Sequence, residues 1–325
     1  MVAKEIKRFG NICTKTQPEL KNYLYSVLKS NGYNPVSEDG FLYAKGELPY
    51  LVTAHMDTVH KVQVSRYSVH RFKGMHRIQS KVGIGGDDRC GVWMIVRMVL
   101  DGYRPSILFC EDEEIGSVGA GKFCKTKYLD DLCDMRYLIE LDRAHEKDAV
   151  FYDCDNKDFT KFILETTEYH EEMGSFSDIV ELSENSGIAS VNLSCGYYNA
   201  HKTSEYVMFE EMQNTLKVVE KLLRTECQQF EYVPKARYGF FKNYYDDDWY
   251  LYYDSKMKPS TKKSAATYGG LEIVYNTYTK EKDGTYTPED MCEYVNGDTL
   301  EECFEIFFIT HPDICYGDVI DYYEI

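Results

Sequence analysis

The chain has 325 residues, with 54 acidic and 37 basic side chains and a formal net charge of −17. Its hydrophobic fraction of 43%, which includes 16 Phe and 29 Tyr, suffices for a packed core, so the composition excludes wholesale disorder. The acidic balance argues against sequence-independent binding of nucleic acid or of an anionic membrane, because both need a basic protein surface.

Nothing in the sequence indicates membrane insertion or export. The longest apolar stretches, such as residues 92–100, contain charges such as Arg97 and are far shorter than the ~20 residues of a membrane span. The first residues lack the apolar core of a secretion signal. The 11 Cys include no Cys-x-x-Cys pair, and their odd number fits reduced thiols better than disulfides. We therefore expect a cytoplasmic protein.

Residues 1–225 alternate apolar runs of strand length with runs of helical period, which predicts an α/β domain. The expected elements are, in chain order, a helix over 18–30, a strand over 50–54, a helix over 91–100, strands over 106–110, 136–141 and 188–193, and an amphipathic helix over 209–224. Polar residues of types that can bind metal or take part in catalysis follow several of these strands, where open α/β sheets place their active sites.

The composition changes near residue 226. Residues 226–325 carry 20 acidic and 9 basic side chains and 15 of the 29 Tyr. Aromatic runs on both sides of Asp246–Asp248 predict a hairpin, and residues 287–290 and 298–299 predict two helix starts. Because this segment holds no catalytic motif, we expect a small α+β appendage that caps the first domain, self-associates or binds a protein partner.

The polar residues after the strands form pairs and single positions in a definite order. They are His55 and Asp57, Asp87 and Asp88, Glu113 and Glu114, Asp142, and His201. Carboxylates gathered at one sheet edge repel one another unless a cation binds between them. Nitrogen and oxygen ligands without sulfur suit zinc, cobalt or manganese, and a bridging carboxylate allows two ions at ~3.5–4 Å separation. An adjacent Glu pair lets one carboxylate bind metal while the other handles a proton.

Five segments that contain these residues resemble one known family in both content and order: TAHMDTV, GGDDRCGV, EDEEIGSVGA, IELDRA and NLSCGYYNAHKTSEYV. They are similar to the co-catalytic dinuclear zinc exopeptidases, with peptidase T-like enzymes as the nearest motif match and the smaller zinc aminopeptidases also similar. The resemblance covers roughly residues 17–224. It implies a mixed sheet flanked by helices, of the zinc aminopeptidase and phosphorylase/hydrolase-like type, and an aminopeptidase or a di- or tripeptidase that acts on short peptides.

The resemblance also implies a role for each residue. His55 and Asp142 would bind one zinc, Glu114 and His201 would bind the other, and Asp87 would bridge the two; cobalt or manganese could replace zinc.

Asp87 rather than Asp88 is assigned the bridge because Gly91 follows it at the family's four-residue spacing, and the Asp87–Asp88 peptide bond is expected to be cis. Asp57 would orient the metal-binding imidazole. Glu113 would be the general base that activates the metal-bridged water and passes its proton to the leaving amine.

One departure from the family concerns the segment between Asp142 and His201. Peptidase T and related enzymes insert a lid and dimerisation domain there, whereas only 58 residues intervene in this chain. We therefore expect no lid, and neither a lid-dependent tripeptide preference nor dimerisation through a lid.

Smaller features near the motifs leave alternatives open. Arg143 or His145 could reach the substrate, and Ser177-Asp178 resembles an element that lines the family's pocket. Tyr197 and Tyr198 fit either an oxyanion donor or, more in keeping with tyrosines in general, a core or rim position.

Three other functions compete with an exopeptidase. An amidohydrolase or deacylase could use the same two metals on a non-peptide amide. A metal-dependent phosphoesterase or nuclease shares the acidic clusters, but the net charge and the lack of a basic track argue against it. A catalytically inactive binding protein on a peptidase scaffold is the third, and the intact ligand set and base argue against it.

Overall fold

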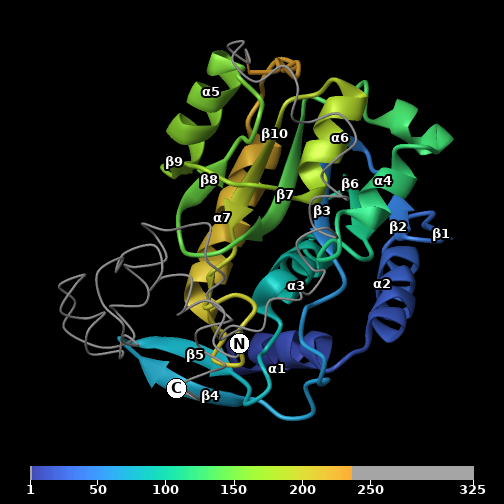
Figure 1. Ribbon diagram of the computed structural model, residues 1–325. Helices are drawn as coiled ribbons and strands as arrows, with labels where there is room; N and C mark the ends of the chain where they lie inside the picture. The colour runs from blue at the N-terminus through green and yellow to red at the C-terminus, as the bar shows by residue number, and fades with distance from the viewer. Residues whose placement is uncertain (1, 236–325) are drawn as a thin grey trace, which may run out of the picture. The chain divides into compact units, whose positions relative to one another are not determined.

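The strand-length apolar runs assemble into an eight-stranded mixed sheet in the computed structural model of the protein, which describes residues 2–235 (Figure 1). The order is β1-β2-β6-β3-β7-β10-β8-β9. The strands are β1 (Val36–Glu38), β2 (Phe41–Ala44), β3 (Leu48–His55), β6 (Pro105–Cys110), β7 (Tyr137–Arg143), β8 (Asp148–Val150), β9 (His170–Glu172) and β10 (Ser190–Ser194). The predicted α/β fold with a mixed sheet flanked by helices is confirmed.

The four central strands, β6, β3, β7 and β10, run parallel and are almost continuously apolar. All six residues of β6 are buried, as are residues 50–55 of β3. Parallel strands have this composition because helices cover both of their faces. The register places His55 opposite Cys110 and Thr53 opposite Glu140, so the carboxyl ends of β3, β6 and β7 lie level with one another.

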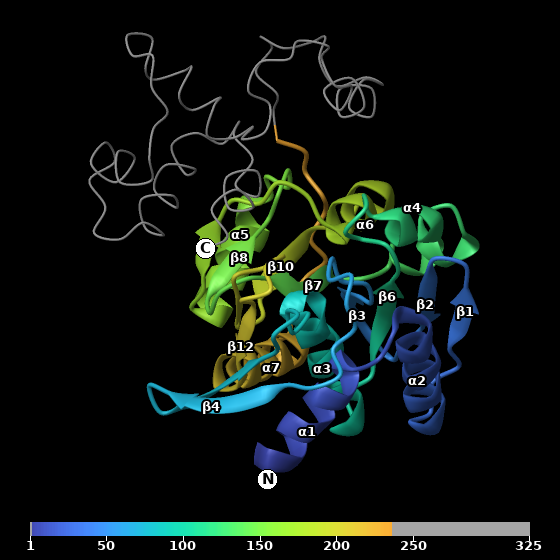
Figure 2. The same cartoon turned by 60° about the horizontal axis from the view of Figure 1, so that its bottom comes forward.

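Helices cover the two faces of this sheet (Figure 2). One face packs against α4 (Val118–Phe123), α6 (Asp178–Ser186) and the 3-10 helix η1 (Lys127–Asp131). The other packs against α1 (Val2–Cys13), α2 (Gln17–Ser30), α3 (Gly86–Leu100), α5 (Lys157–Thr167) and α7 (Phe209–Arg224). The side chains of β3 alternate accordingly, since Leu51 belongs to the first core and Val52 to the second.

The predicted helices occur close to their expected positions. The helix expected over 18–30 is α2, which begins with a capping box in which Glu19 accepts hydrogen bonds from the backbone N–H and the hydroxyl of Thr16. The helix expected over 209–224 is α7. The helix expected over 91–100 is α3, which begins at Gly86; Asp87 and Asp88 within it have non-helical backbone angles.

A second, four-stranded antiparallel sheet was not predicted from the sequence. Its order is β11-β12-β5-β4, and its strands are β4 (Ser68–Phe72), β5 (Met75–Gln79), β11 (Tyr197–Tyr198) and β12 (Tyr206–Met208). Strands β4 and β5 form a hairpin, and β5 also pairs with β12, where Val207 lies opposite Ile78. The loop between β11 and β12 contains His201, so this sheet fixes both ends of that loop.

The described chain continues past the predicted domain boundary at residue 225 and packs against the first domain as far as residue 235. Phe230 is buried, its backbone N–H donates to the carbonyl of Arg136, and its carbonyl accepts from the N–H of Ala189. The predicted hairpin and helix starts of the appendage lie outside the described residues. Within residues 2–235, no helix has the length and apolar character needed to cross a membrane.

The segment between Asp142 and His201 forms β8, α5, β9, α6, β10 and β11. Three of these strands belong to the eight-stranded sheet, and both helices pack on it.

Candidate metal centre

Two three-residue clusters of nitrogen and oxygen ligands share one carboxylate at the carboxyl ends of the central strands. His55, Asp87 and Asp142 form one cluster, and Asp87, Glu114 and His201 form the other. Within each cluster, one ligand atom per residue lies within 4.8 Å of the others. The structure therefore brings together all five residues that the family resemblance assigned as ligands.

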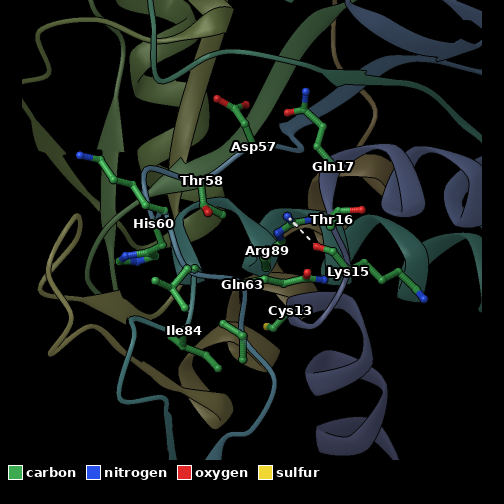
Figure 3. Close-up of a pocket in the computed structure, with 14 residues that line it drawn as sticks. Cys13, Lys15, Thr16, Gln17, Asp57, Thr58, His60, Gln63, Ile84 and Arg89 are labelled. Atoms are coloured by element: carbon green, nitrogen blue, oxygen red, sulfur yellow. Dashed lines mark hydrogen bonds between the residues drawn. The ribbon is translucent and has the colours of Figure 1, made fainter.

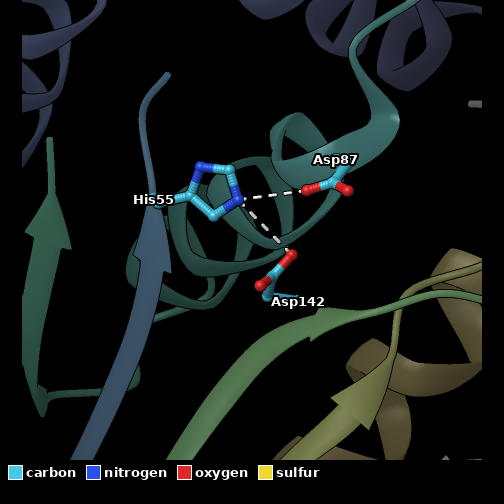
Figure 4. A group of neighbouring side chains, drawn as sticks. All are labelled: His55, Asp87 and Asp142. Atoms are coloured by element: carbon cyan, nitrogen blue, oxygen red, sulfur yellow. Dashed lines mark hydrogen bonds and ion pairs between the residues drawn. The ribbon is translucent and has the colours of Figure 1, made fainter. Parts of the chain in front are cut away.

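The first cluster is built on regular secondary structure and is buried (Figure 4). His55 is the last residue of β3, Asp142 lies near the end of β7, and Asp87 stands at the start of α3. The Nε2 atom of His55 lies 3.1 Å from Oδ1 of Asp87 and 3.5 Å from Oδ1 of Asp142. The His55 side chain is only 1% exposed.

The second cluster is built on loops and faces solvent. Glu114 lies in the loop after β6, and His201 lies in the loop between β11 and β12. The Nε2 atom of His201 lies 3.1 Å from Oδ2 of Asp87 and 3.2 Å from Oε2 of Glu114. The His201 side chain is 55% exposed. Asp87 thus turns one oxygen toward each histidine.

Asp88 has a different environment from Asp87, although the two are adjacent. Its Oδ1 accepts from the backbone N–H of Gly91 at 2.8 Å, and its Oδ2 accepts from the N–H of His55 at 3.2 Å. Asp88 therefore ties the start of α3 to the end of β3 through backbone contacts. The peptide bond between the two aspartates is cis, as the resemblance implied.

Asp57 connects the two halves of the site. Its Oδ1 lies 3.2 Å from Nδ1 of His55, and its two oxygens accept from the backbone N–H groups of Glu113 and Glu114 at 3.1 Å each. A proton on Nδ1 that this carboxylate accepts would leave Nε2 of His55 available to a cation held together with Asp87 and Asp142. The same carboxylate fixes the turn that carries the Glu pair.

The electrostatics of the site reflect several carboxyl groups in a buried space. Burial, reinforced by the charge of Asp142, raises the pKa of Glu113 to about 9. Burial and the charge of Asp87 raise the pKa of Asp142 to about 7. The carboxylates of Asp87 and Glu114 raise the pKa of His201 to about 10. Each shift reflects in part an excess of negative charge that a bound cation would also offset.

Each cluster has a donor set that could hold a divalent metal ion. Ligand atoms ~2.0–2.2 Å from a tetrahedral ion are about 3.4 Å from one another, and the histidine-to-carboxylate separations of 3.1–3.5 Å in the two clusters agree with this spacing. Oε1 of Glu114 is buried and has no hydrogen-bond partner among the described residues, as expected for a carboxylate that binds a cation.

Glu140 and Asn192 lie beside the ligands and carried no assigned role in the sequence, whereas Ser177 was noted there as part of an element that resembles a pocket lining. The Ser177 hydroxyl donates to Oε2 of Glu140 at 2.6 Å and lies 3.2 Å from Oδ2 of Asp142. The side-chain oxygen of Asn192 accepts from the backbone N–H of Asp142 at 2.9 Å. Glu140 stands between Ile139 and Leu141, and Asn192 stands between Val191 and Leu193. A large polar residue between buried apolar neighbours is the signal that could have found them.

The remaining residues singled out in the sequence lie near the site. The Tyr197 hydroxyl is 3.2 Å from the backbone carbonyl of Asp142, and the Tyr198 hydroxyl donates to Glu211 at 2.7 Å. Both hydroxyls thus have partners within the protein, which agrees with the core or rim alternative. His145 is exposed, and its Nδ1 lies 3.3 Å from Oδ2 of Asp148.

A cavity of about 310 Å³ lies beside Asp57, which is the only one of the predicted site residues that lines it (Figure 3). His60 and Arg89 also line it, and the Arg89 guanidinium donates to the backbone carbonyl of Lys15 at 3.2 Å. Neither cluster's histidine belongs to its wall.

No protein-family model matches the chain, and no curated protein matches its sequence. Solved structures do resemble it. The aminopeptidase PepT of Bacillus cereus is 14% identical, with 67% of this chain and 97% of that chain covered and a TM-score of 0.55. A tripeptidase of Staphylococcus aureus is 12% identical, with 67% and 96% covered and a TM-score of 0.53. The Pyrococcus horikoshii TET1 peptidase, which can assemble into a tetrahedron or a large octahedral shell, is 13% identical, with 69% and 99% covered and a TM-score of 0.50. At these identities the likeness establishes a shared fold.

Proposed function

We propose that the protein is a metal-dependent exopeptidase, an aminopeptidase or a di- or tripeptidase, that holds two divalent ions, zinc in preference to cobalt or manganese. The observation that carries this proposal is the position of Asp87, which offers one oxygen to each of two nitrogen- and oxygen-ligand clusters. A carboxylate shared in this way can hold two ions at the ~3.5–4 Å separation of dinuclear hydrolytic sites. The aminopeptidase fold of the similar structures supports the proposal.

His55, Asp142 and Asp87 would hold one ion, and Glu114, His201 and Asp87 would hold the other. When bound, the ions would polarise the scissile carbonyl and make water a stronger nucleophile at neutral pH.

The protein's own side chains divide the remaining work. Asp57 holds the His55 ring in orientation and anchors the backbone of the Glu pair. Glu113, whose neighbour Glu114 is assigned to metal, remains to take a proton from the attacking water and return it to the leaving amine. Burial raises the pKa of Glu113 to about 9, which supports a role in which this carboxyl group holds the proton between the two transfers.

An assay of amino-acid release tests the proposal. The metal-stripped protein is supplied with zinc, cobalt or manganese and given short peptides with free or N-acetylated amino termini. An aminopeptidase releases the first residue from the free peptides only. Cleavage of the acetyl group alone would indicate the alternative of an amidohydrolase or deacylase. Two bound metals without any hydrolysis would indicate a binding protein on a peptidase scaffold.

We further propose that residues 226–325 supply no ligand and no catalytic group, and that they cap the domain, self-associate or bind a partner. The similar TET1 peptidase can assemble into a tetrahedron or a large octahedral shell, which supports self-association of this chain in general. Because residues 226–235 pack on the domain, a truncation should end near residue 237 rather than 225. Sedimentation and metal content of that truncation, compared with the full chain, test both statements.

A further inference from the structure

A buried carboxylate that belongs to neither candidate ligand set contacts the backbone of the ligand that the two sets share. Glu205, four residues after His201, is completely buried. Its Oε2 accepts from the backbone N–H of Gly85 at 2.6 Å, and its Oε1 accepts from the backbone N–H of Asp87 at 3.1 Å. Its Oε2 also lies 2.8 Å from Nε2 of His60. Glu205 therefore acts on the backbone from which the Asp87 side chain projects.

The loop that precedes Asp87 needs such an external support. Gly83 and Gly85 both have positive φ angles, of 83° and 68°, and glycines give the free loop access to many other conformations. The loop also runs close to β11 and β12, because a Cβ atom on Gly86 would lie 2.7 Å from Cβ of Tyr197 and 2.8 Å from Val207. Its buried N–H groups must be hydrogen-bonded, and Glu205 accepts two of them.

The charge of Glu205 is compensated where it lies. A buried carboxylate without partners would be costly, whereas two backbone donors and an imidazole satisfy most of its hydrogen-bonding capacity. His60 is itself held in place by the chain, since its ring fills the space that a side chain on Gly83 would need. The contacts form a chain from the wall of the cavity beside Asp57, through His60 and Glu205, to Asp87.

We propose that Glu205 is a positioning residue that fixes the Gly85–Asp87 backbone, so that the two oxygens of Asp87 face the two histidines at the same time. This inference rests on the proposed function, in which both clusters bind metal. It has a consequence that sets Glu205 apart from the ligands themselves. Loss of Glu205 should weaken both metal sites together, because Asp87 belongs to both, whereas loss of Glu114 should weaken only one.

Zinc titration of the metal-stripped full chain tests the proposal with Glu205→Gln. The amide keeps the shape of the carboxylate but turns an NH₂ group toward one of the two backbone donors. We expect both zinc dissociation constants to rise ~10–100-fold, the range for partners that orient metal ligands. The visible spectrum of the cobalt-substituted protein should change as well, because the ligand field depends on the position of Asp87.

Glu211→Gln is the matched control. Glu211 is a nearly buried carboxylate on the neighbouring helix α7 and accepts from the Tyr198 hydroxyl, which an amide oxygen can still accept. It should leave both constants and the cobalt spectrum unchanged. Normal constants in Glu205→Gln, weakening at one site only, or equal weakening in Glu211→Gln would each overturn the positioning role.

Failure of this inference can be told from failure of the proposed function. If the wild-type protein binds two ions and hydrolyses peptides while Glu205→Gln binds them normally, only the positioning role is wrong. If the wild-type protein binds no metal, the proposed function is wrong. If Glu205→Gln does not fold, His60→Gln takes its place. It removes the ring and its contact with Glu205, and it should weaken both sites by a smaller, equal factor; unchanged constants would again overturn the role.

Discussion

The two clusters that share Asp87 differ in what holds them. His55 is the last residue of a central strand and is fully enclosed, whereas His201 stands in a loop of the small second sheet and is more than half exposed. One ligand set is therefore fixed by the core of the domain, and the other by hydrogen bonds between loops. The comparison shows that the candidate site combines an enclosed half with a half that is open to solvent.

Glu113→Gln should have the largest effect on turnover while leaving both halves intact. The amide keeps the shape of the side chain but cannot take a proton, and loss of positioned acid–base catalysis lowers turnover by ~10²–10⁴-fold. Peptide hydrolysis and metal content, measured on the same preparation, check this. Glu114→Gln is the control and should instead weaken metal at the His201 half. Undiminished hydrolysis by fully metallated Glu113→Gln would place the base elsewhere.

Paired alanine variants test the difference between the halves directly. His55→Ala and His201→Ala should each lose one ion, but only His55→Ala should unfold at clearly lower denaturant concentration when metal is absent. Removal of an enclosed ring leaves a cavity and unpartnered carboxylates, which lowers the free energy of unfolding by ~2–5 kcal/mol. Removal of an exposed ring lowers it by well under ~1 kcal/mol. Equal losses of unfolding free energy would contradict the contrast in burial.

Asp57→Asn should weaken the enclosed half more than the open half. The amide cannot hold a proton on Nδ1 of His55 and also accept from both backbone N–H groups of the Glu pair, so the ring loses its fixed orientation. We expect zinc affinity to fall ~10–100-fold at the His55 site and less at the His201 site. Competitive titration with a chromophoric chelator resolves the two constants. A uniform loss at both sites would show that Asp57 acts through the Glu113–Glu114 turn instead.

Metal removal should make stability depend on pH, with a modest change in Tm. The folded-state pKa values of Glu113, about 9, and Asp142, about 7, lie above those of an unfolded chain. The stability that these groups contribute is complete below the unfolded values and is lost as pH rises through the folded ones. His201, raised to about 10, acts in the same direction above pH ~6.5. The metal-free protein should therefore melt at a lower temperature at pH 9 than at pH 5, and saturating zinc should abolish that decline.

The sequence sufficed for the parts of the molecule whose pattern is local. Strand-length apolar runs predicted β3, β6, β7 and β10, and their polar ends predicted where the ligands gather. The resemblance then assigned the bridging role to Asp87 rather than Asp88. In the structure Asp87 faces both histidines, whereas Asp88 accepts from backbone N–H groups.

The supporting residues could not be predicted because their partners are distant in the sequence. Glu205 meets Gly85 across 120 positions, and Ser177 meets Glu140 across 37. The hairpin of β4 and β5 was not predicted because most of its strand residues are polar and Ile78 alone among them is buried, which leaves little apolar alternation to detect. The packing of residues 226–235 escaped for a related reason, since a change in composition marks a change of surroundings only approximately.

The hydrogen bonds of Asp57 have a consequence for how such a chain can evolve. A single carboxylate contacts the ring of His55 and accepts hydrogen bonds from the backbone N–H groups of Glu113 and Glu114. The proposed metal-binding and proton-transfer functions therefore both depend on this one side chain. A lineage that exchanged this aspartate would disturb both functions in one step. Other side chains around the site can therefore change one at a time during evolution. A change at Asp57 itself would need a compensating change in the residues that it holds.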